Sequence, residues 1–305
     1  MTVRPSIWIA LVAVYILWGS TYLAIRLSVE TIPPFAMSGL RFVIAGGTLL
    51  AWRLYVAARA GTLPTAMQWR RALVIGALLL LGGNGAVAWA EQTVPSGITA
   101  LIVSSVPLWM ALIDRVFFGR RLSIAAIVGL VVGFGGVALL VDGPSWGGSV
   151  SLLGAAILVA GSLSWASGSI YARQAHMPED SLLSTGMEML LGGLCLCIAA
   201  LATGEFSHLD IAAVTTQSWI AFAYLIFFGG IAGFSAYLWV IRNGPTTLVS
   251  TYAFVNPMVA VFLGWTLGHE LVGPRVVAAG VTIIAAVALI VSSREKPPVE
   301  SGECG

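Results

Sequence analysis

Ten apolar runs, each long enough to cross a bilayer as a helix, constrain the fold of this chain more than any other feature. A hydrocarbon core about 30 Å thick is spanned by roughly 20 helical residues, and a helix satisfies its own backbone hydrogen bonds in lipid. The runs are 6–25, 34–52, 72–90, 96–117, 123–141, 151–172, 181–203, 217–240, 246–267 and 274–293. The sequence therefore predicts an all-α membrane protein with ten transmembrane helices.

The composition agrees with lipid as the main solvent. Charged residues make up 9% of the 305 residues and hydrophobic residues 58%, whereas an ordinary soluble domain is about 25% charged. The net charge of +2 provides no basic face that could neutralise phosphates, so nucleic acid is excluded as a partner. The lipid bilayer is the expected partner, and an oligomer is allowed but not required.

The two ends of the chain need separate interpretations. Arg4 before the first run allows a cleaved signal peptide. The length of the run, the lack of an A-x-A cleavage site and a counterpart later in the chain favour a retained helix. Residues 294–305 contain Pro and Glu and follow the last run. We expect them to form a disordered cytoplasmic tail.

Positive charges are distributed unevenly between the two sides of the predicted bundle. Twelve of the 15 Lys and Arg residues fall on the side of the N-terminus. Only Arg26 and Arg275 fall on the other side, and Arg41 lies within a run. Because positive residues accumulate in cytoplasmic loops, we expect a multi-pass protein of the bacterial inner (cytoplasmic) membrane with both termini in the cytoplasm.

The second half of the chain repeats features of the first half. Some residues recur 147 positions later and others 150 positions later, in register across five helices. The pairs are Trp18 and Trp165, Arg26 and Arg173, Arg41 and Glu188, Trp89 and Trp239, Pro95 and Pro245, and Pro107 and Pro257. A unit of five spans begins on one side of the membrane and ends on the other, so its second copy must be inverted. We assign the two inverted five-helix repeats to residues 1–142 and 143–293, around a central cavity.

Several stretches resemble the EamA repeats of the drug/metabolite transporter (DMT) superfamily. They are WGSTYLAIRLSVETIPPF, LRFVIAG, VPSGITALIVSSVPLW, SLSWASGSIYAR and YAFVNPMVAVFLGWTLGHE, and the resemblance covers essentially the whole chain. Within the superfamily, the chain is similar to bacterial exporters of aromatic and other amino acids. The resemblance implies ten helices, cytoplasmic termini and a cavity lined by helices one, three, four, six, eight and nine. The chain departs from the family's pattern in one respect, because the ninth helix ends in Gly268-His269-Glu270, whereas the fourth ends in Gly119-Arg120-Arg121.

Polar side chains within the runs are the first candidates for a substrate site, because they are costly in lipid. Asn84 lies among glycines, which let a ligand or a helix approach closely. Asn256 precedes Pro257, and Ser104 and Ser105 occupy the matching place before Pro107. Proline-broken helices at corresponding points of two halves point to a transporter site. The alternative is hydrogen bonding between helices, which contributes about 0.6 kcal/mol per contact.

Aromatic side chains are weaker candidates for the same site. Trp18, Trp165, Tyr237 and Tyr252 lie well inside their runs, where each needs a polar partner and can stack on an apolar group. We expect them to line the cavity or, alternatively, to pack between helices.

Arg41 and Glu188 are charges inside the runs at equivalent repeat positions. One interpretation is a gating or coupling role. The other is that neighbouring backbone and hydroxyl groups satisfy each charge separately. Inversion of the repeat places their Cα atoms about 10 Å apart in height within a core of about 30 Å, which argues against a direct pair.

The sequence contains no catalytic constellation, so we do not expect an enzyme. His176, His208 and His269 all fall in connections between runs, so no buried His–carboxylate pair is expected for acid–base chemistry or metal binding. The chain has no G-x-x-x-x-G-K-[ST] loop for ATP. We expect no metal and no cofactor.

These features favour a secondary transporter that exports small amphiphilic metabolites by alternating access of its two inverted repeats. Amino acids, including aromatic and hydrophobic ones, are the preferred substrates, because a cavity with amides, hydroxyls and aromatic rings but few charges suits a zwitterion with an apolar side chain. The alternative is the same fold exporting drugs, sugars or nucleosides. A non-transporting scaffold is disfavoured, since it gains nothing from an inverted register. The sequence leaves a facilitator and a proton antiporter both open.

Overall fold

The computed structural model describes residues 5–60, 62–119, 123–141, 151–243 and 251–293, and the regular elements within these ranges are all helices. The half up to residue 141 contains α1 (Pro5–Val29), α2 (Pro34–Ala60), α3 (Ala66–Gly76), the π-helix η1 (Ala77–Asn84), α4 (Gly85–Ala90), α5 (Ser96–Val103), α6 (Val106–Phe118) and α7 (Ile124–Val141). The half from residue 151 contains α8 (Leu152–Gln174), α9 (Ser181–Ala202), α10 (Glu205–His208), the short 3₁₀-helix η2 (Ile211–Ala213), α11 (Thr216–Tyr224), the π-helix η3 (Leu225–Ala232), α12 (Gly233–Asn243), α14 (Tyr252–Thr266) and α15 (Pro274–Ser293).

The predicted all-helical membrane fold is confirmed. Eight helical segments of the described chain are long and apolar enough to cross a membrane, and two shorter apolar helices, Ile124–Leu140 and Tyr252–Thr266, coincide with the fifth and ninth predicted runs. A total of ten spans stays a prediction. α2 continues to Ala60, beyond its expected end at residue 52. The predicted boundary between residues 142 and 143 and the predicted tail at 294–305 lie outside the described residues.

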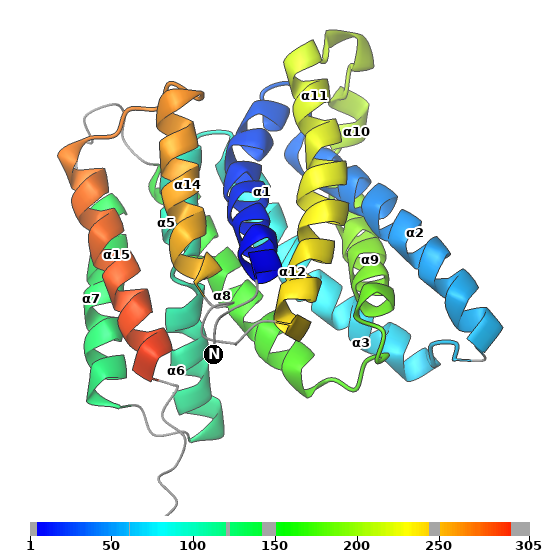
Figure 1. The fold of residues 1–305 in the computed structure, drawn as a ribbon. Helices are drawn as coiled ribbons and strands as arrows, with labels where there is room; N and C mark the ends of the chain where they lie inside the picture. Colours follow the sequence, from blue (N-terminus) through cyan, green and yellow to red (C-terminus); the bar gives the residue numbers. More distant parts are fainter. Residues whose placement is uncertain (1–4, 61, 120–122, 142–150, 244–250, 294–305) are drawn as a thin grey trace, which may run out of the picture.

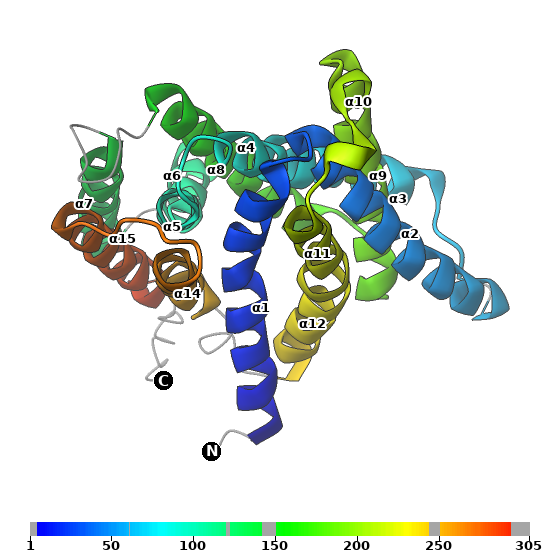
Figure 2. The same ribbon diagram turned by 90° about the horizontal axis from the view of Figure 1, so that it is seen from above.

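The helices form a bundle with two distinct ends (Figure 1). We call the end at which α1 begins the near end and the opposite end, at the top of Figure 1, the far end. α2 and α5 begin at the far end, and α14 ends there. Seen from above, α1 lies between α14 and the α11–α12 helix, while α2 with α9 and α7 with α15 form the two edges (Figure 2).

Glycines bring α2 and α9 into close contact. A Cβ atom placed on Gly46 would lie 2.5 Å from the backbone nitrogen of Leu190, and one on Gly193 would lie 2.8 Å from that of Val43. Only glycine fits at such distances, because real Cβ atoms do not approach backbone so closely. Gly46 and Gly193 are 147 residues apart, as are Val43 and Leu190. Each half therefore makes the same contact to the other.

A second reciprocal contact lies further along the same pair of helices. A Cβ atom on Gly39 would lie 2.9 Å from the backbone nitrogen of Cys197, and one on Gly186 would lie 2.8 Å from that of Leu50. These positions again obey the offset of 147 residues. The contacts run in opposite directions along the two helices, so α2 and α9 are antiparallel.

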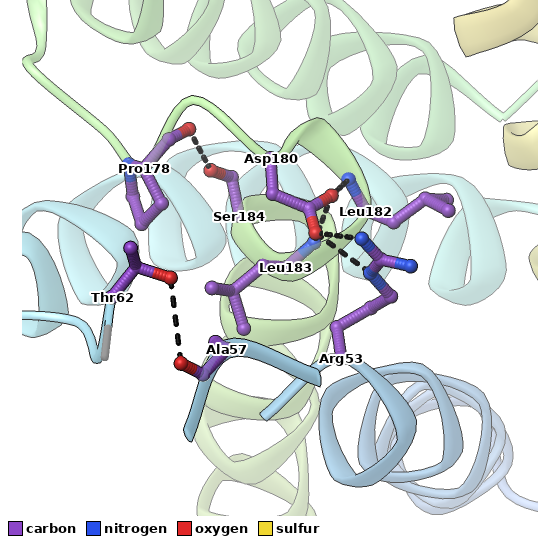
Figure 3. Close-up of polar contacts among 8 residues, drawn as sticks. All are labelled: Arg53, Ala57, Thr62, Pro178, Asp180, Leu182, Leu183 and Ser184. Carbon is purple, nitrogen blue, oxygen red and sulfur yellow. Dashed lines mark hydrogen bonds and ion pairs between the residues drawn. The ribbon is translucent and has the colours of Figure 1, made fainter. Parts of the chain in front are cut away.

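Polar contacts fix both ends of this helix pair. At the near end, Asp180 caps α9 by accepting from the Leu182 N–H at 3.0 Å, and it also forms an ion pair with Arg53 of α2 (Figure 3). At the far end, Glu205 accepts from the Ala36 N–H of α2 at 2.8 Å. A carboxylate at a helix N-terminus receives otherwise unpaired N–H groups and is favoured by the helix dipole.

The opposite edge of the bundle is also held by glycines. A Cβ atom on Gly129 or on Gly136 of α7 would lie 2.7 Å from Ile290 or Ile283 of α15, respectively. Gly129 and Gly136 therefore pack α7 against α15. Small residues allow such close approach in lipid, where no hydrophobic driving force brings helices together.

A π-helical stretch interrupts the third helix of each half. η1 covers Ala77–Asn84 and η3 covers Leu225–Ala232, so the two start 148 residues apart. π-bulges are rare and occur often at functional sites. The apolar periodicity of these runs gave no indication of this local winding.

Candidate functional site

Three of the predicted aromatic residues meet between α1, α12 and α14. The Trp18 ring centroid lies 4.7 Å from that of Tyr237 and 5.6 Å from that of Tyr252, and the two tyrosine rings are 5.5 Å apart. Phe234 of α12 joins them at 5.3 Å from Trp18. We call Trp18, Phe234, Tyr237 and Tyr252 the aromatic cluster. Its two hydroxyls and its indole N–H give polar atoms to an otherwise apolar surface.

Asn256 lies on α14, one turn beyond Tyr252, and its main chain is close to α1. The residue is 8% exposed, and its Oδ1 atom has no hydrogen-bond partner among the described residues. A Cβ atom on Gly19 of α1 would lie 3.0 Å from the Asn256 carbonyl oxygen, so the two helices are in close contact here. A buried acceptor without a partner costs about 1–3 kcal/mol. Asn256 therefore has an unused acceptor that a ligand could satisfy.

Asn84, at the end of η1, is engaged within the protein. The Arg41 Nη2 atom donates a hydrogen bond of 2.6 Å to Asn84 Oδ1, and the Arg41 guanidinium also lies 4.4 Å from the Phe42 ring centroid. Arg41 is 4% exposed. Arg41 thus interacts with an amide and an aromatic ring and forms no ion pair with Glu188. This contact favours the interpretation in which neighbouring groups satisfy the charge of Arg41.

The remaining predicted residues lie on other helices. Trp165 of α8 covers Gly83, where a Cβ atom would lie 2.7 Å from the indole ring, so Trp165 is close to Asn84. The Ser104 hydroxyl donates to the Leu101 carbonyl oxygen at 2.6 Å, within its own helix. Glu188 lies part-buried on α9. Most of the predicted residues therefore fall into two groups, the aromatic cluster with Asn256 and the Arg41–Asn84 pair with Trp165 beside the neighbouring Gly83. No contact recorded among the described residues places Ser104 or Glu188 in either group.

Two cavities open on the side of η1 and α4. One has a volume of about 440 Å³ and lies at the far end, between the α1–α2 connection and α10. The other has a volume of about 390 Å³, lies between η1, α4 and α8, and is lined by Gly82, Gly85 and mostly apolar side chains. Phe35 and Trp89 border both cavities. Gly82 and Gly85 thus border the second cavity, while Gly82 and Gly83 let Ser164 and Trp165 of α8 approach closely.

One carboxylate joins the two halves at the far end. Glu270, in the connection after α14, accepts from the Ser96 N–H at 2.6 Å and from the Gly97 N–H at 3.0 Å. These N–H groups at the start of α5 have no partner within the helix, and their partial positive charge favours an anion. A Cβ atom on Gly97 would lie 3.1 Å from the Val261 Cα atom, so α5 and α14 are in tight contact. Glu270, to which the sequence assigned no role, bridges that contact.

Glu91 is a buried acid that the sequence analysis missed. It directly follows α4, just beyond the span Ala66–Ala90, and is 0% exposed. Neither of its carboxylate oxygens has a hydrogen-bond partner among the described residues, while its main-chain carbonyl accepts from Arg26 Nη1. Its position beside Gln92, at the end of a run, made it look like an ordinary boundary residue. The only indication was the Pro95 that follows, which restarts the chain as α5 and folds this connection back into the bundle.

The fold and these contacts define a polytopic membrane protein with polar groups held between two similar halves. The sequence pattern of the EamA-like transporter family matches residues 5–142 and again residues 152–292. The chain therefore belongs to this family. It is a membrane transporter for which the lipid bilayer is the solvent and a small molecule is the substrate.

Proteins of similar sequence also indicate a membrane transporter. The chain is 41% identical over 281 residues to the inner membrane transporter YedA of Escherichia coli K12, covering 91% of this chain and 88% of that one. It is 24% identical to the transporter YvbV of Bacillus subtilis, over 90% of this chain and 88% of that one. A solved crystal structure aligns with a TM-score of 0.63 at 20% identity, over 95% of this chain and 98% of that one. This last similarity concerns the fold alone.

Proposed function

We propose that this chain exports small amphiphilic metabolites, amino acids foremost, across the inner membrane. The observation that carries the proposal is the aromatic cluster next to Asn256, whose Oδ1 atom is buried without a partner. The rings can receive an apolar or aromatic side chain, and an amide oxygen can accept from an ammonium group. Rings and acceptor both lie where α14 meets α1, as an amphiphilic substrate requires.

Alternating access of two inverted repeats, residues 1–142 and 143–293, is the mechanism we propose. The reciprocal glycine contacts between α2 and α9 support it, because an offset of 147 residues with antiparallel helices is what a twofold axis between the halves produces. Substrate sites of such transporters lie at the interface between the repeats. α1 with α12 and α14 brings both halves to the aromatic cluster.

The substrate class is tested by uptake into proteoliposomes. We expect labelled aromatic and hydrophobic amino acids to be transported without ATP, and unlabelled ones to compete. A drug, a sugar and a nucleoside belong in the same panel. Transport of one of these in place of amino acids would keep the fold and replace the proposed cargo, whereas no transport of any compound would contradict an exporter of this chemistry.

Reporter fusions test the inverted arrangement. Fusions at Gly61 and Gly119 should report the cytoplasm, and fusions at Pro144 and Gly204 the periplasm, because twelve of the 15 positive residues lie on the N-terminal side. A single reporter on the wrong side would refute the inverted repeat and the count of ten spans together.

A further inference from the structure

The contact between α5 and α14 joins the two halves of the chain at the far end. α5 belongs to the first half and α14 to the second, and Glu270 links them through the Ser96 and Gly97 N–H groups. The side chain of Ser96 is fully buried in this contact. For the far end to open, α5 and α14 must separate, and Glu270 must leave the start of α5.

Glu91 lies close to this contact and is surrounded by charged groups from several elements. Tyr22 and Arg26 of α1, Arg41 of α2 and Glu270 after α14 all interact with it electrostatically. α8 and η1 also pack against α4, but contribute none of these groups. Arg26 donates to the main-chain carbonyl of Glu91, and the structure records no ion pair between the Glu91 carboxylate and either arginine.

Burial is the main reason why this carboxyl favours its neutral form. Burial raises the pKa of Glu91 well above its ordinary value, and the nearby Glu270 carboxylate raises it further, while Arg26 and Arg41 act in the opposite direction. An ionised carboxylate that is buried without a hydrogen bond is strongly disfavoured. In water the same group has a pKa of about 4.3.

We propose that Glu91 is a proton-binding site whose occupancy holds the far end closed. When α5 and α14 separate, water reaches the carboxyl, which releases its proton to the far side. When they close, the carboxylate takes up a proton from the same side as it is buried. This inference rests on the alternating access proposed above.

The direction of the pH effect follows from the proton affinities of Glu91 in the closed and the open state. The closed state binds the proton more tightly than the open state, so proton binding shifts the population toward the closed state. Between the ordinary pKa of an exposed carboxyl, about 4.3, and the raised value in the closed state, a rise in pH therefore favours opening. Below this window both states are protonated, and above it both are ionised.

The test measures opening of the far end without any substrate. Ser96→Cys is introduced in a chain whose three native cysteines are replaced by alanine, and its labelling by a membrane-impermeant maleimide is followed from pH 5 to pH 9. Ser96 is suitable because its hydroxyl has no hydrogen-bond partner to lose among the described residues. Labelling of Gln92→Cys, an exposed position at the same end, corrects for the effect of pH on the thiol itself.

We expect the corrected labelling of Ser96→Cys to rise with pH, up to about tenfold for each unit by which the two pKa values differ. Glu91→Gln, which stays neutral, should keep labelling low at every pH. Glu30→Gln is the matched control, because Glu30 is an exposed acid at the same end, and it should keep the rise. A flat profile in the parent, or an unchanged rise with Glu91→Gln, overturns the proposal.

A second variant and the absence of substrate keep the test decisive. If Glu91→Gln does not reach the membrane, Glu91→Asp replaces it, because it moves the carboxyl group by one methylene. An unchanged midpoint in the pH dependence of Ser96→Cys labelling would then contradict the proposal. Because no substrate is present, the labelling result is independent of the cargo. A failure of the transport panel and a failure of the proton site are therefore distinguishable.

Discussion

The contact between α2 and α9 is the same when viewed from either helix, whereas the contact between α5 and α14 is not. In the first, Gly46 meets Leu190 as Gly193 meets Val43, and the equivalent residues are 147 positions apart. In the second, the halves meet through the Glu270 carboxylate and the Ser96 N–H group. One region uses small residues on both sides, and the other uses an acid on one side only.

Other polar residues depart from the repeat in the same way. With the offset of 150 residues, Asn256 corresponds to Val106 and Glu91 corresponds to Ile241. Glu270 follows the ninth helix, whereas Arg120-Arg121 stand at the corresponding place in the first half. The packing of α2 on α9 therefore follows the repeat, while these polar residues break it. Substitutions in the two regions should differ accordingly, with loss of folding in the first and loss of transport in the second.

The largest effect is expected in the symmetric region. Gly46→Val adds three carbons where a single Cβ atom would already lie 2.5 Å from the Leu190 nitrogen, so we expect a loss of at least about 3 kcal/mol in the free energy of unfolding, at the upper end of overpacking costs. Gly193→Val, its symmetric equivalent, should lose a similar amount. Unfolding in mixed micelles measures both.

The adjacent glycine provides the control for this prediction. A Cβ atom on Gly47 would meet no atom within 4 Å, and alanine is a better helix former than glycine by about 1 kcal/mol. Gly47→Ala should therefore keep or raise stability. Equal destabilisation by Gly46→Val and Gly47→Ala would mean that the close contact between α2 and α9 does not hold the halves together.

The sequence predicted the symmetric region better than the asymmetric one. Apolar run length depends only on local composition, so all-helical structure and the approximate positions of the helices followed from it. The offset of 147 residues could also be recognised from Trp18, Arg41 and their counterparts. The reciprocal glycine contacts obey that offset, although which helix each glycine faces depends on packing that no single run encodes.

The roles of individual polar residues depended on tertiary contacts and could not be predicted in the same way. Asn84 was recognised as a polar group inside a helix, but its bond to Arg41 joins residues 43 positions apart. Glu91 was overlooked because a charge at the end of a run normally faces water. Its burial results from the way that α5 returns into the bundle after Pro95, which the sequence did not reveal.

The next effect separates the two asparagines. If Asn84 only bound substrate, its loss would leave stability near that of the parent, but the structure shows it accepting from a buried guanidinium. Asn84→Ala should therefore cost about 1.5–3 kcal/mol, the range for hydrogen bonds to charged groups. The Arg41→Met, Asn84→Ala double variant should recover most of this loss, because removing both partners leaves no unpaired charge. A double variant that is as unstable as the single one would argue against the bond.

A smaller effect is expected at the near end of the α2–α9 pair. Arg53→Met removes a partly exposed ion pair, with side chains 23% and 27% exposed, and such pairs contribute at most about 1 kcal/mol. Asp180→Ala also removes the cap that accepts from the Leu182 N–H, and loss of a cap costs about 0.5–2 kcal/mol. Asp180→Ala should therefore lower the melting temperature more than Arg53→Met. The reverse order would assign the stability of this end to the ion pair.

The smallest effect on stability is expected at Asn256, together with a clear effect on transport. The Oδ1 atom of Asn256 has no hydrogen-bond partner among the described residues, so Asn256→Ala removes a buried acceptor that now destabilises the fold and creates only a small cavity. These two contributions oppose each other, since an unsatisfied buried acceptor costs about 1–3 kcal/mol and lost side-chain volume also carries a cost. We therefore expect the free energy of unfolding to change by no more than about 1 kcal/mol. Uptake of amino acids into proteoliposomes should fall markedly, because the substrate loses the acceptor next to the aromatic cluster.

Met258→Ala serves as the control for Asn256→Ala, since Met258 is 57% exposed on the same helix and should leave uptake unchanged. Normal uptake with Asn256→Ala would show that the amide of α14 is structural, and that the asymmetry of this region has a purpose other than substrate binding.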